Sequence, residues 1–527
     1  MSYSTGKLSF ILIAAVLLAA LGAWLIAARY RAALRRLMSA PAATIAAPGA
    51  ATPGPAAAPP RAAIVWPTLA GNRRAGWRLT LFLVGVSMLV ATSSAAMQLV
   101  DAVGTQGFAV KRLGVLAAVG LWPFLPALAI VWRWSRVRLF FAFVLFLAAA
   151  FLLMLWRSIE PRPLELLFYL SLDVLPSMLL IALLCLGRTT RAIAPWLLPP
   201  AVGLAWASIA GIDLLAFLLA RRQAWLGTLG DAIGVHAVFA LFAFAPWFIA
   251  WWPMRMLGRL LARAYSRRAI SELALQFGAV WAMQLIWVAL SAASEHGIVA
   301  LVMLLPLLWI PLAFLVLRRW NAVPAHPPTL LVLRVFQHDA DVRAMFDRIV
   351  ERWRLTGNTV LIAGTDLIDQ TLDADDALTF LDGRLGERFV ACPADVDARI
   401  AEFDLLPDLE GRFRINECYC RDSTWRDAFA ALAGRSDVVL MDLRGFQARN
   451  AGCRHELATL AQSSHVGRVV VLTDAATDRA SAEAAAIGAP AGRFSWLDIA
   501  ARTPVDADAL LARLLAPASC RRLRRSG

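Results

Sequence analysis

Residues 301–336 read LVMLLPLLWIPLAFLVLRRWNAVPAHPPTLLVLRVF, and the character of the chain changes within this stretch. An apolar run ends at Arg318 and Arg319, and a second, shorter apolar run begins at Leu330 after a proline-containing connection. Up to Arg319 the chain holds 27 Lys+Arg against 8 Asp+Glu, a net charge of +19; beyond it there are 25 against 29, a net charge of −4, which together give the +15 of the whole chain. This asymmetry indicates two parts with different surroundings.

The first part is rich in apolar runs. Mean hydropathy is +0.63 and 60% of residues are hydrophobic, which is more than the core of a soluble protein of 527 residues requires. A helix of about 20 apolar residues crosses the ~30 Å hydrocarbon layer of a bilayer. The sequence therefore predicts a polytopic α-helical membrane region of about nine spans. They are 8–28, 79–100, 113–132, 139–156, 164–186, 196–219, 232–252, 275–293 and 297–317.

The distribution of basic residues predicts the orientation. If Arg29 is cytoplasmic, the loops on its side hold 20 Lys+Arg and the opposite loops hold seven. The positive-inside rule then places the N-terminus outside and the C-terminal part in the cytoplasm. Lysine occurs only at Lys7 and Lys111, a bias typical of GC-rich bacterial genomes, so we expect a multi-pass protein of the bacterial inner membrane. Anionic lipid explains the basic loops better than nucleic acid does, so the expected partner is the lipid bilayer.

These patterns divide the chain into a first transmembrane helix at 1–36, an Ala/Pro-rich linker at 37–76, a membrane bundle of about eight helices at 77–319 and an α/β domain at 320–527. The linker lacks hydrophobic periodicity, so we expect the first helix to be a loosely attached anchor. Beyond the span at 232–252, arginines recur in steps of four, a spacing suited either to the lipid interface or to a solvated helix face. These arginines are Arg255, Arg259, Arg263 and Arg267.

Few ionisable groups fall within the predicted spans. In the orientation above, four of them lie in the outer half of their spans, where they could form a vestibule for a cation or a substrate. The alternative is that they are polar residues at helix ends that reach the interface. The sequence shows no inverted repeat and no pair of broken helices of the kind that indicates a transporter. The four residues are Asp173, Asp213, Asp231 and His236.

The second part alternates short apolar runs with amphipathic stretches, which predicts a parallel sheet covered by helices, in a flavodoxin-like or Rossmann-like layout. We expect four or five strands with 437–443 central, and 384–420 reads as an insertion. The strands are 330–336, 359–363, 437–443, 468–473 and 493–497; the helices are 341–355, 374–382, 394–404, 423–433, 451–464, 478–487 and 506–515. The cysteines show no chelating spacing, so no metal site is expected.

Polar residues follow the predicted strands, and ligands of open α/β sheets bind at that carboxyl edge. Asp339 and Asp474 could instead cap the helices that follow. No G-x-G-x-x-G, G-x-x-x-x-G-K-[ST] or G-x-S-x-G motif occurs in this part, which disfavours dehydrogenases, P-loop NTPases and α/β-hydrolases. The candidate ligand-binding residues are Gln337, His338, Gly364, Thr365, Asp366 and Arg444.

The candidate catalytic residues are Asp442, at the end of a buried strand, and Glu456, on the helix that begins near Gly452. Helical spacing puts Glu456 on the same face as Cys453 and Leu457, which is the packed face. Burial of a carboxylate there is unfavourable unless the carboxylate has an ion-pair partner or a functional role. A neighbouring arginine could supply a structural partner: Arg444, Arg449 or Arg454.

The segment GCRHEL at 452–457 resembles the S-x-W-C-x-x-E-L segment of TIR domains and the G-x-x-x-E-L/I segment of nucleoside deoxyribosyltransferase-like proteins. The resemblance covers roughly 330–475 and includes LRVF at 333–336, Trp425 and the strand SDVVLMDL; Gly452 stands where TIR domains have Trp, and 384–420 has no counterpart. It implies a TIR-like fold in which Glu456 is the catalytic carboxylate acting at a glycosidic carbon. It also implies cleavage of NAD⁺ or a nucleoside, or self-association.

Two functions stay open at this point. The first is an inner-membrane protein with a cytoplasmic TIR-like effector or signalling domain, which would be an enzyme if it cleaves an N-glycosidic bond of NAD or a nucleotide. The second is a membrane transport or scaffold protein whose Rossmann-like domain binds a nucleotide or a partner without catalysis. An ion pair that commits Glu456 to an arginine would favour the second.

Overall fold

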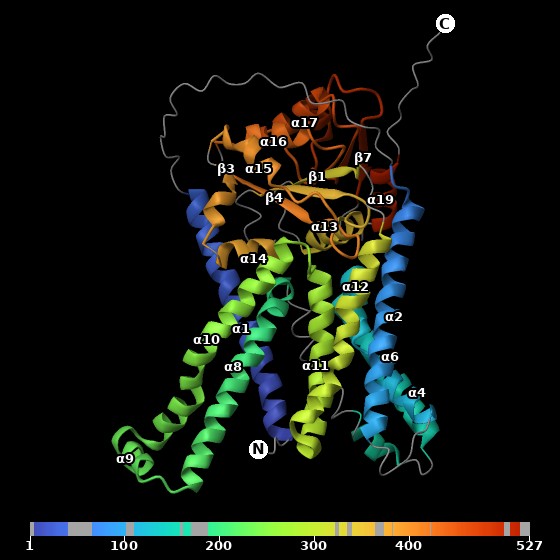
Figure 1. Cartoon of the computed structure of the whole chain (residues 1–527). Coiled ribbons are helices and arrows are strands. Elements are labelled where there is room, and N and C mark those ends of the chain that lie inside the picture. Colours follow the sequence, from blue (N-terminus) through green and yellow to red (C-terminus); the bar gives the residue numbers. More distant parts are fainter. Residues whose placement is uncertain are drawn as a thin grey trace.

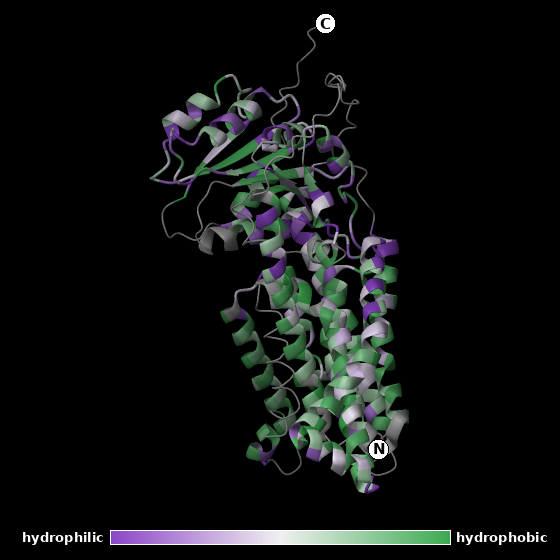
Figure 2. Cartoon of the chain, turned by 90° about the vertical axis from the view of Figure 1, so that its left-hand side faces the viewer, coloured by the Kyte–Doolittle hydropathy of each residue, from purple (hydrophilic) through white to green (hydrophobic). Residues whose placement is uncertain are grey.

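A bundle of long helices carries an α/β domain on one of its ends, and the chain begins at the opposite end of the bundle (Figure 1). This computed structural model describes residues 5–39, 66–101, 110–158, 162–168, 170, 188–321, 326–334, 340–363, 374–381, 383–390, 392–421, 423–499 and 506–516. Hydrophobic residues dominate the bundle and the strands of the sheet, whereas hydrophilic residues cover the outer helices of the domain (Figure 2).

Seven helices among the described residues are long and apolar enough to cross a membrane. An eighth span is possible if the bent pair α4 (Val110–Val119) and α5 (Phe124–Val131) counts as one. These eight coincide with eight of the nine predicted spans, and most of 164–186 lies outside the described residues. The seven comprise α1 (Thr5–Ser39), α2 (Leu69–Asp101), α6 (Arg136–Arg157), α8 (Arg188–Ala220), α10 (Val235–Ser266), α11 (Glu272–His296), and η1 (Gly297–Leu308) continued by α12 (Trp309–Trp320).

The bend between α4 and α5 is 44°, so the predicted span at 113–132 is a broken helix. The helix stops at Gly120 and restarts after Pro123, whose ring cannot donate the backbone hydrogen bond that a continuous helix needs. The sequence does not reveal this break, because the apolar run continues through the turn.

The first helix is an integral part of the bundle, contrary to the expected loose anchor. Ala15, Ala19, Ala23 and Ala27 recur every four residues and are fully buried, in one core cluster with residues of α8. Small side chains at this spacing let helix backbones approach closely. The helix also continues to Ser39, and α2 already begins at Leu69, so both helices extend into the stretch read as a linker.

Helices α8 and α10 pack closely against each other. A Cβ atom added at Gly211 of α8 would lie 1.9 Å from the Phe242 carbonyl oxygen of α10, and one at Gly203 would lie 2.4 Å from Met254 Sδ. Only glycine fits at such a crossing.

The domain contains a seven-stranded, wholly parallel sheet in the order β3-β4-β2-β1-β5-β6-β7. All five predicted strands are present, and β5 lies in the interior between β1 and β6, as expected from its unbroken apolar sequence. The strands are β1 (Thr329–Arg334), β2 (Asn358–Ala363), β3 (Phe389–Val390), β4 (Ile415–Cys420), β5 (Val438–Asp442), β6 (Arg468–Thr473) and β7 (Phe494–Asp498).

The stretch 384–420 is part of the sheet, so the predicted count of four or five strands is too low. It supplies β3 and β4, which extend the sheet beyond β2. Strand β4 reads INECYC. Its polar residues Asn416 and Glu417 interrupt the apolar pattern by which the other strands were predicted. Both are buried, and both bond within the protein: the Asn416 amide to the backbone of Asp404, and the Glu417 carboxylate to the Tyr419 hydroxyl at 2.5 Å.

Helices cover both faces of the sheet. Alternate residues of β1 point to opposite cores: Leu330 and Val332 pack with α13 and α19, and Leu331 and Leu333 pack with α15, α16 and α17. The α13 face is turned toward the bundle (Figure 1). The helices of the domain are α13 (Ala340–Trp353), α14 (Ala374–Leu381), α15 (Asp395–Ala401), α16 (Trp425–Ala433), α17 (Ala451–Gln462), α18 (Arg479–Ala485) and α19 (Ala507–Leu515).

The strand order defines where a ligand would bind. The sequence β2-β1-β5-β6-β7 follows the flavodoxin-like order, and adding β4 outside β2 gives the doubly wound order of dinucleotide-binding sheets. In both readings the strand order reverses between β1 and β5. The domain is therefore Rossmann-like, with its switch point at the carboxyl ends of these two strands.

Replacing Gly211 by alanine should destabilise the bundle, because the new methyl group must displace the α10 backbone from α8. Overpacking of this kind costs about 1–3 kcal/mol. Thermal unfolding of the full-length protein in detergent measures the effect. Gly85→Ala is the matched control, because a Cβ there meets nothing within 4 Å. Equal unfolding midpoints for both variants would contradict the close crossing.

Candidate functional site

A carboxylate paired with a guanidinium group lies at the carboxyl edge of the sheet, at the switch point. Asp442 ends β5 and is almost fully buried. Its carboxylate accepts hydrogen bonds from Arg444 Nε at 2.9 Å, from Arg444 Nη2 at 2.7 Å and from the Arg444 backbone N–H at 3.1 Å. Asp442 and Arg444, predicted in separate catalytic and ligand-binding roles, thus form one bidentate ion pair, which fixes the guanidinium at this edge.

The next loop along the edge is held by Asp474. Its carboxylate accepts hydrogen bonds from the Gly445 N–H at 2.9 Å and from the Thr477 hydroxyl at 2.7 Å, so it ties the loop after β5 to the loop after β6. Gly445 has φ of 72°, a left-handed conformation that favours glycine. The predicted helix-capping role of Asp474 is wrong, because Asp478 caps α18 by accepting from the Ser481 N–H.

Glu456 lies in the second turn of α17, as predicted, and is half-buried. Burial raises the pKa of the neighbouring Cys453 thiol to about 12, and the negative charge of Glu456 adds to this rise. Trp425 of α16 packs against the start of the helix: its ring meets His455 edge-on at 5.7 Å, and it lies 3.8 Å from a Cβ built at Gly452. The ring of Trp425 thus lies beside Gly452, although it comes from α16 and not from α17 itself.

The other predicted residues do not all come together. Gln337, His338, Gly364, Thr365, Asp366, Asp173 and the predicted helix cap Asp339 lie outside the described residues. Asp213 is half-buried in α8, whereas Asp231 in α9 (Ala224–Ile233) and His236 at the start of α10 are exposed. The exposure of these last two favours polar residues at helix ends over a vestibule.

A second polar cluster, missed by the sequence analysis, joins the domain to the bundle. Its centre is Glu351 in the last turn of α13, which is almost fully buried. Its carboxylate pairs with Arg133 of the bundle at 2.5 Å, with Arg354 at 3.0 Å and with Arg412. Three guanidinium groups around this carboxylate replace the hydration that burial removes from Glu351.

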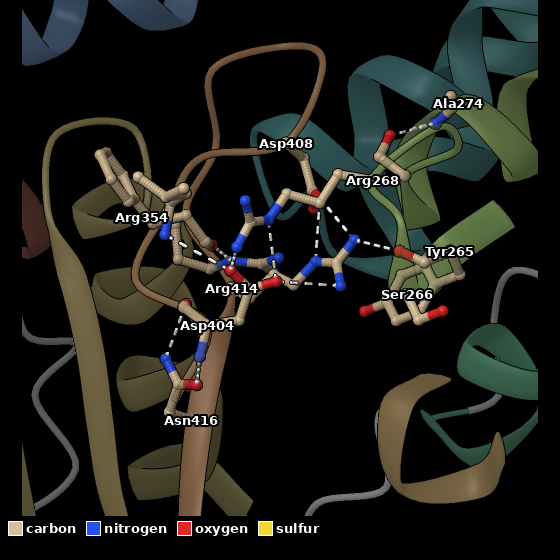
Figure 3. A network of polar contacts seen from close by, with 12 residues as sticks. Tyr265, Ser266, Arg268, Ala274, Arg354, Asp404, Asp408, Arg414 and Asn416 are labelled. Carbon is tan, nitrogen blue, oxygen red and sulfur yellow. Dashed lines mark hydrogen bonds and ion pairs between the residues drawn. The ribbon is translucent and has the colours of Figure 1, made fainter. Parts of the chain in front are cut away.

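The loop 402–414 continues this cluster toward α10 (Figure 3). Arg414 pairs with Asp408 at 2.7 Å and with Asp404 at 3.2 Å, and it donates to the Tyr265 carbonyl of α10 at 2.9 Å. Its guanidinium also lies 3.9 Å from the centre of the Tyr265 ring. Arg268, just beyond α10, pairs with Asp404 in turn. We call the whole set the ionic junction. It comprises Arg133, Tyr265, Arg268, Glu351, Arg354, Asp404, Asp408, Arg412 and Arg414.

Apolar contacts reinforce the ionic junction. Leu409, at the tip of the loop, is buried in the same core cluster as Leu79 of α2 and Phe314 of α12. The Asn321 amide at the end of α12 donates to the Leu409 carbonyl at 3.2 Å. The domain is therefore packed against the end of the bundle through its side chains, in addition to its covalent connection.

Glu410, beside Leu409, is a buried carboxyl group with an unusual pKa. Burial raises the pKa of Glu410 to about 7, and the negative charge of Asp408 adds to the rise, whereas Arg412 and a hydrogen bond with Ser271 oppose it. Burial likewise raises the pKa of Asp408 against the opposing effect of Arg414. Protonation near neutral pH thus changes the charge of the loop that enters the bundle.

Metal binding finds no support in the described part of the chain, where no group of three His, Cys, Asp or Glu residues could hold an ion. Of the four cysteines in the described part of the domain, Cys418, Cys420 and Cys453 are buried and Cys392 is exposed. Burial raises the pKa of the Cys418 thiol to about 11, which disfavours the thiolate that a metal requires.

Comparison of the chain with protein-family models, with curated proteins and with solved structures finds no match.

Removing the central carboxylate of the ionic junction should strongly destabilise the protein. Glu351→Ala leaves Arg354 and Arg412 buried without their partner, a change that typically costs about 3–5 kcal/mol. Denaturant unfolding of the full-length protein in detergent measures the loss. Asp397→Ala is the control, since this carboxylate pairs with Arg435 at 2.9 Å but is 81% exposed and should contribute less than about 1 kcal/mol. Similar losses in both variants would contradict a buried junction.

The stability of the protein should fall as the pH rises through about 7, because of Glu410. Its pKa is raised from 4.5 to about 7 in the folded state, so the folded protein binds more protons than the unfolded chain between these values. The stabilisation is complete below about pH 4.5 and is lost as pH rises through 7. Unfolding midpoints measured from pH 5 to 8 should show this fall in the wild type and in Glu387→Gln, whose side chain is 69% exposed, but not in Glu410→Gln. A persistent slope in Glu410→Gln would assign the fall to another group.

Proposed function

We propose that this chain is an integral membrane signalling protein in which a nucleotide-binding Rossmann-like domain and the helical bundle act as one unit. The observation that carries the proposal is the ionic junction, because buried charges that span two parts of a protein penalise any intermediate in which the parts are separated. We infer that the domain faces the cytoplasm, since the arginine-rich ends of the helices, including Arg133 and Arg268, contact it.

Helix α13 connects the two places where this function would act. It starts after the carboxyl end of β1, at the switch point, and its last turn carries Glu351 into the ionic junction. At 1.5 Å per residue, its 14 residues span roughly 21 Å. A helix of this length moves as a rigid rod, so a ligand that shifts its first turn also shifts Glu351.

A nucleotide is the ligand class that fits the switch point best. Helix α13 directs its N-terminus toward this edge, and helix N-termini favour phosphate. Arg444, held by Asp442, adds a fixed guanidinium at the neighbouring strand. We take NAD⁺ as the probe, because it combines a pyrophosphate with two riboses.

Binding of NAD⁺ should change hydrogen exchange in the loop 402–414 of the full-length protein. Arg133→Gln removes the partner that the bundle supplies to Glu351 while leaving Arg354 and Arg412, so this variant should bind NAD⁺ with a weaker response in the loop. Arg138→Gln is the control, because Arg138 lies near the same end of the bundle over the Trp134 ring and outside the junction. Saturating NAD⁺ without any change at 402–414 would contradict the coupling.

N-glycosidic cleavage is a second candidate function, favoured by the position of Glu456 one turn into the helix that follows β5. A carboxylate near a bound ribose could stabilise an oxocarbenium-like charge or attack the glycosidic carbon. Glu456→Gln keeps the shape and removes the charge, so it should preserve folding and abolish release of nicotinamide from NAD⁺ by the full-length protein. Glu483→Gln, on the exposed side of α18, should cleave like the wild type. Cleavage by Glu456→Gln at the wild-type rate would exclude Glu456 as the catalytic group.

A further inference from the structure

One face of α10 carries a continuous exposed stripe that changes from aromatic to cationic along the helix. Its members are Phe248, Trp252, Arg255, Arg259 and Arg263, separated by steps of four, three, four and four residues. Such spacing aligns side chains on one side of a helix. Phe248 is 85% and Trp252 is 68% exposed, and all three arginines are exposed as well. We call this face the α10 stripe.

The arginines of the α10 stripe have no acidic partner among the residues that the structure describes. Arg255, Arg259 and Arg263 form no ion pair within the described part of the chain, whereas Arg268, five residues beyond Arg263, is paired with Asp404. Like charges at four-residue spacing repel one another and destabilise a helix. An arrangement of this kind is favourable when an external anion lies along it.

The aromatic part of the α10 stripe fixes the depth of the cationic part. Helix α10 runs from the end of the bundle that is far from the domain to the end that contacts it (Figure 1). Exposed tryptophans gather at membrane interfaces, and Trp251 is 61% exposed beside Trp252. Arg255 follows Trp252 by three residues, about 4.5 Å along the axis, which places its guanidinium at the level of the lipid headgroups.

We propose that the α10 stripe is a binding surface for the phosphate headgroups of anionic phospholipids in the leaflet next to the α/β domain. The planar guanidinium group binds phosphate through two parallel hydrogen bonds, and successive arginines on one helix face offer several such forks. The acyl chains of the same lipids would lie against Phe248 and Trp252. A zwitterionic headgroup fits less well, because its own cation competes with the arginines for the phosphate.

This inference is independent of what the domain binds. It concerns the bundle alone, and Arg255, Arg259 and Arg263 lie outside the ionic junction. The α10 stripe nevertheless ends within one turn of Tyr265, whose carbonyl holds Arg414. Lipid bound along the stripe would therefore border the contact between α10 and the loop 402–414.

Retention of phosphatidylglycerol by the full-length protein tests the proposal. The protein in detergent is equilibrated with phosphatidylglycerol or phosphatidylcholine, and the bound lipid is counted by native mass spectrometry. The wild type should retain phosphatidylglycerol preferentially. The triple variant Arg255→Gln, Arg259→Gln and Arg263→Gln should lose this preference by on the order of tenfold or more, since each basic residue near an anionic surface contributes about fivefold.

Two matched variants separate the α10 stripe from net charge. Arg426→Gln, Arg449→Gln and Arg454→Gln remove three exposed arginines of the domain and should leave the preference unchanged. Replacing the three stripe arginines with lysine keeps the charge and should retain most of the preference. Wild-type preference in the glutamine variant would overturn the proposal, as would an equal loss in the domain variant. If the triple glutamine variant does not fold, Arg259→Gln alone should lower retention, and unchanged retention there would overturn the proposal too.

Discussion

The burial of Glu351 is the constraint on which the arrangement of the two parts depends. A carboxylate removed from water is unfavourable by several kcal/mol unless cations replace its hydration. Here Arg354 and Arg412 come from the domain and Arg133 comes from the bundle, so compensation is complete only when both parts are in place. The same requirement holds the last turn of α13 and the loop 402–414 against the end of the bundle. In the proposed function, stability and coupling would thus have one physical origin.

The sequence predicts most elements of the fold because their signals are local. Strand β6 begins and ends where its apolar run does, and α17 begins at Ala451 as expected. Strand β4 escaped prediction because its polar residues are satisfied by tertiary partners, such as Asp404 for Asn416. The local sequence does not reveal those tertiary partners. The break between α4 and α5 escaped for the converse reason, since the turn is as apolar as the helices on either side.

The edge of the sheet at which Asp442 and Arg444 lie was predictable, but their pairing was not. Parallel strands bring their carboxyl ends to one edge whatever the side chains do, so Asp442 and Arg444 were expected there. That they bond to each other depends on rotamers that composition does not fix. The ionic junction was beyond sequence reasoning, because Arg133 and Glu351 are 218 residues apart and only the completed fold brings them together. Its one local signal was the run of acids at alternate positions, Asp408 and Glu410, followed by Arg412 and Arg414, which suits a loop that docks on basic helix ends.

The contact between Tyr30 and Tyr419 has a consequence for how the chain is made. The two hydroxyl groups are 2.7 Å apart although 389 residues separate them along the chain, and Tyr419 in turn donates to Glu417 of β4. At ~5–20 residues per second, synthesis of the partner follows that of Tyr30 by roughly 20 to 80 s. During this interval the Tyr30 hydroxyl lacks this partner. The alanine face of α1 finds its partner earlier, when α8 is made, and the ring of Phe380 in α14, which meets the Tyr30 ring edge-on, also precedes β4. The first helix to be made is thus among the last to complete its contacts, because the hydrogen bond of Tyr30 forms only when β4 is in place.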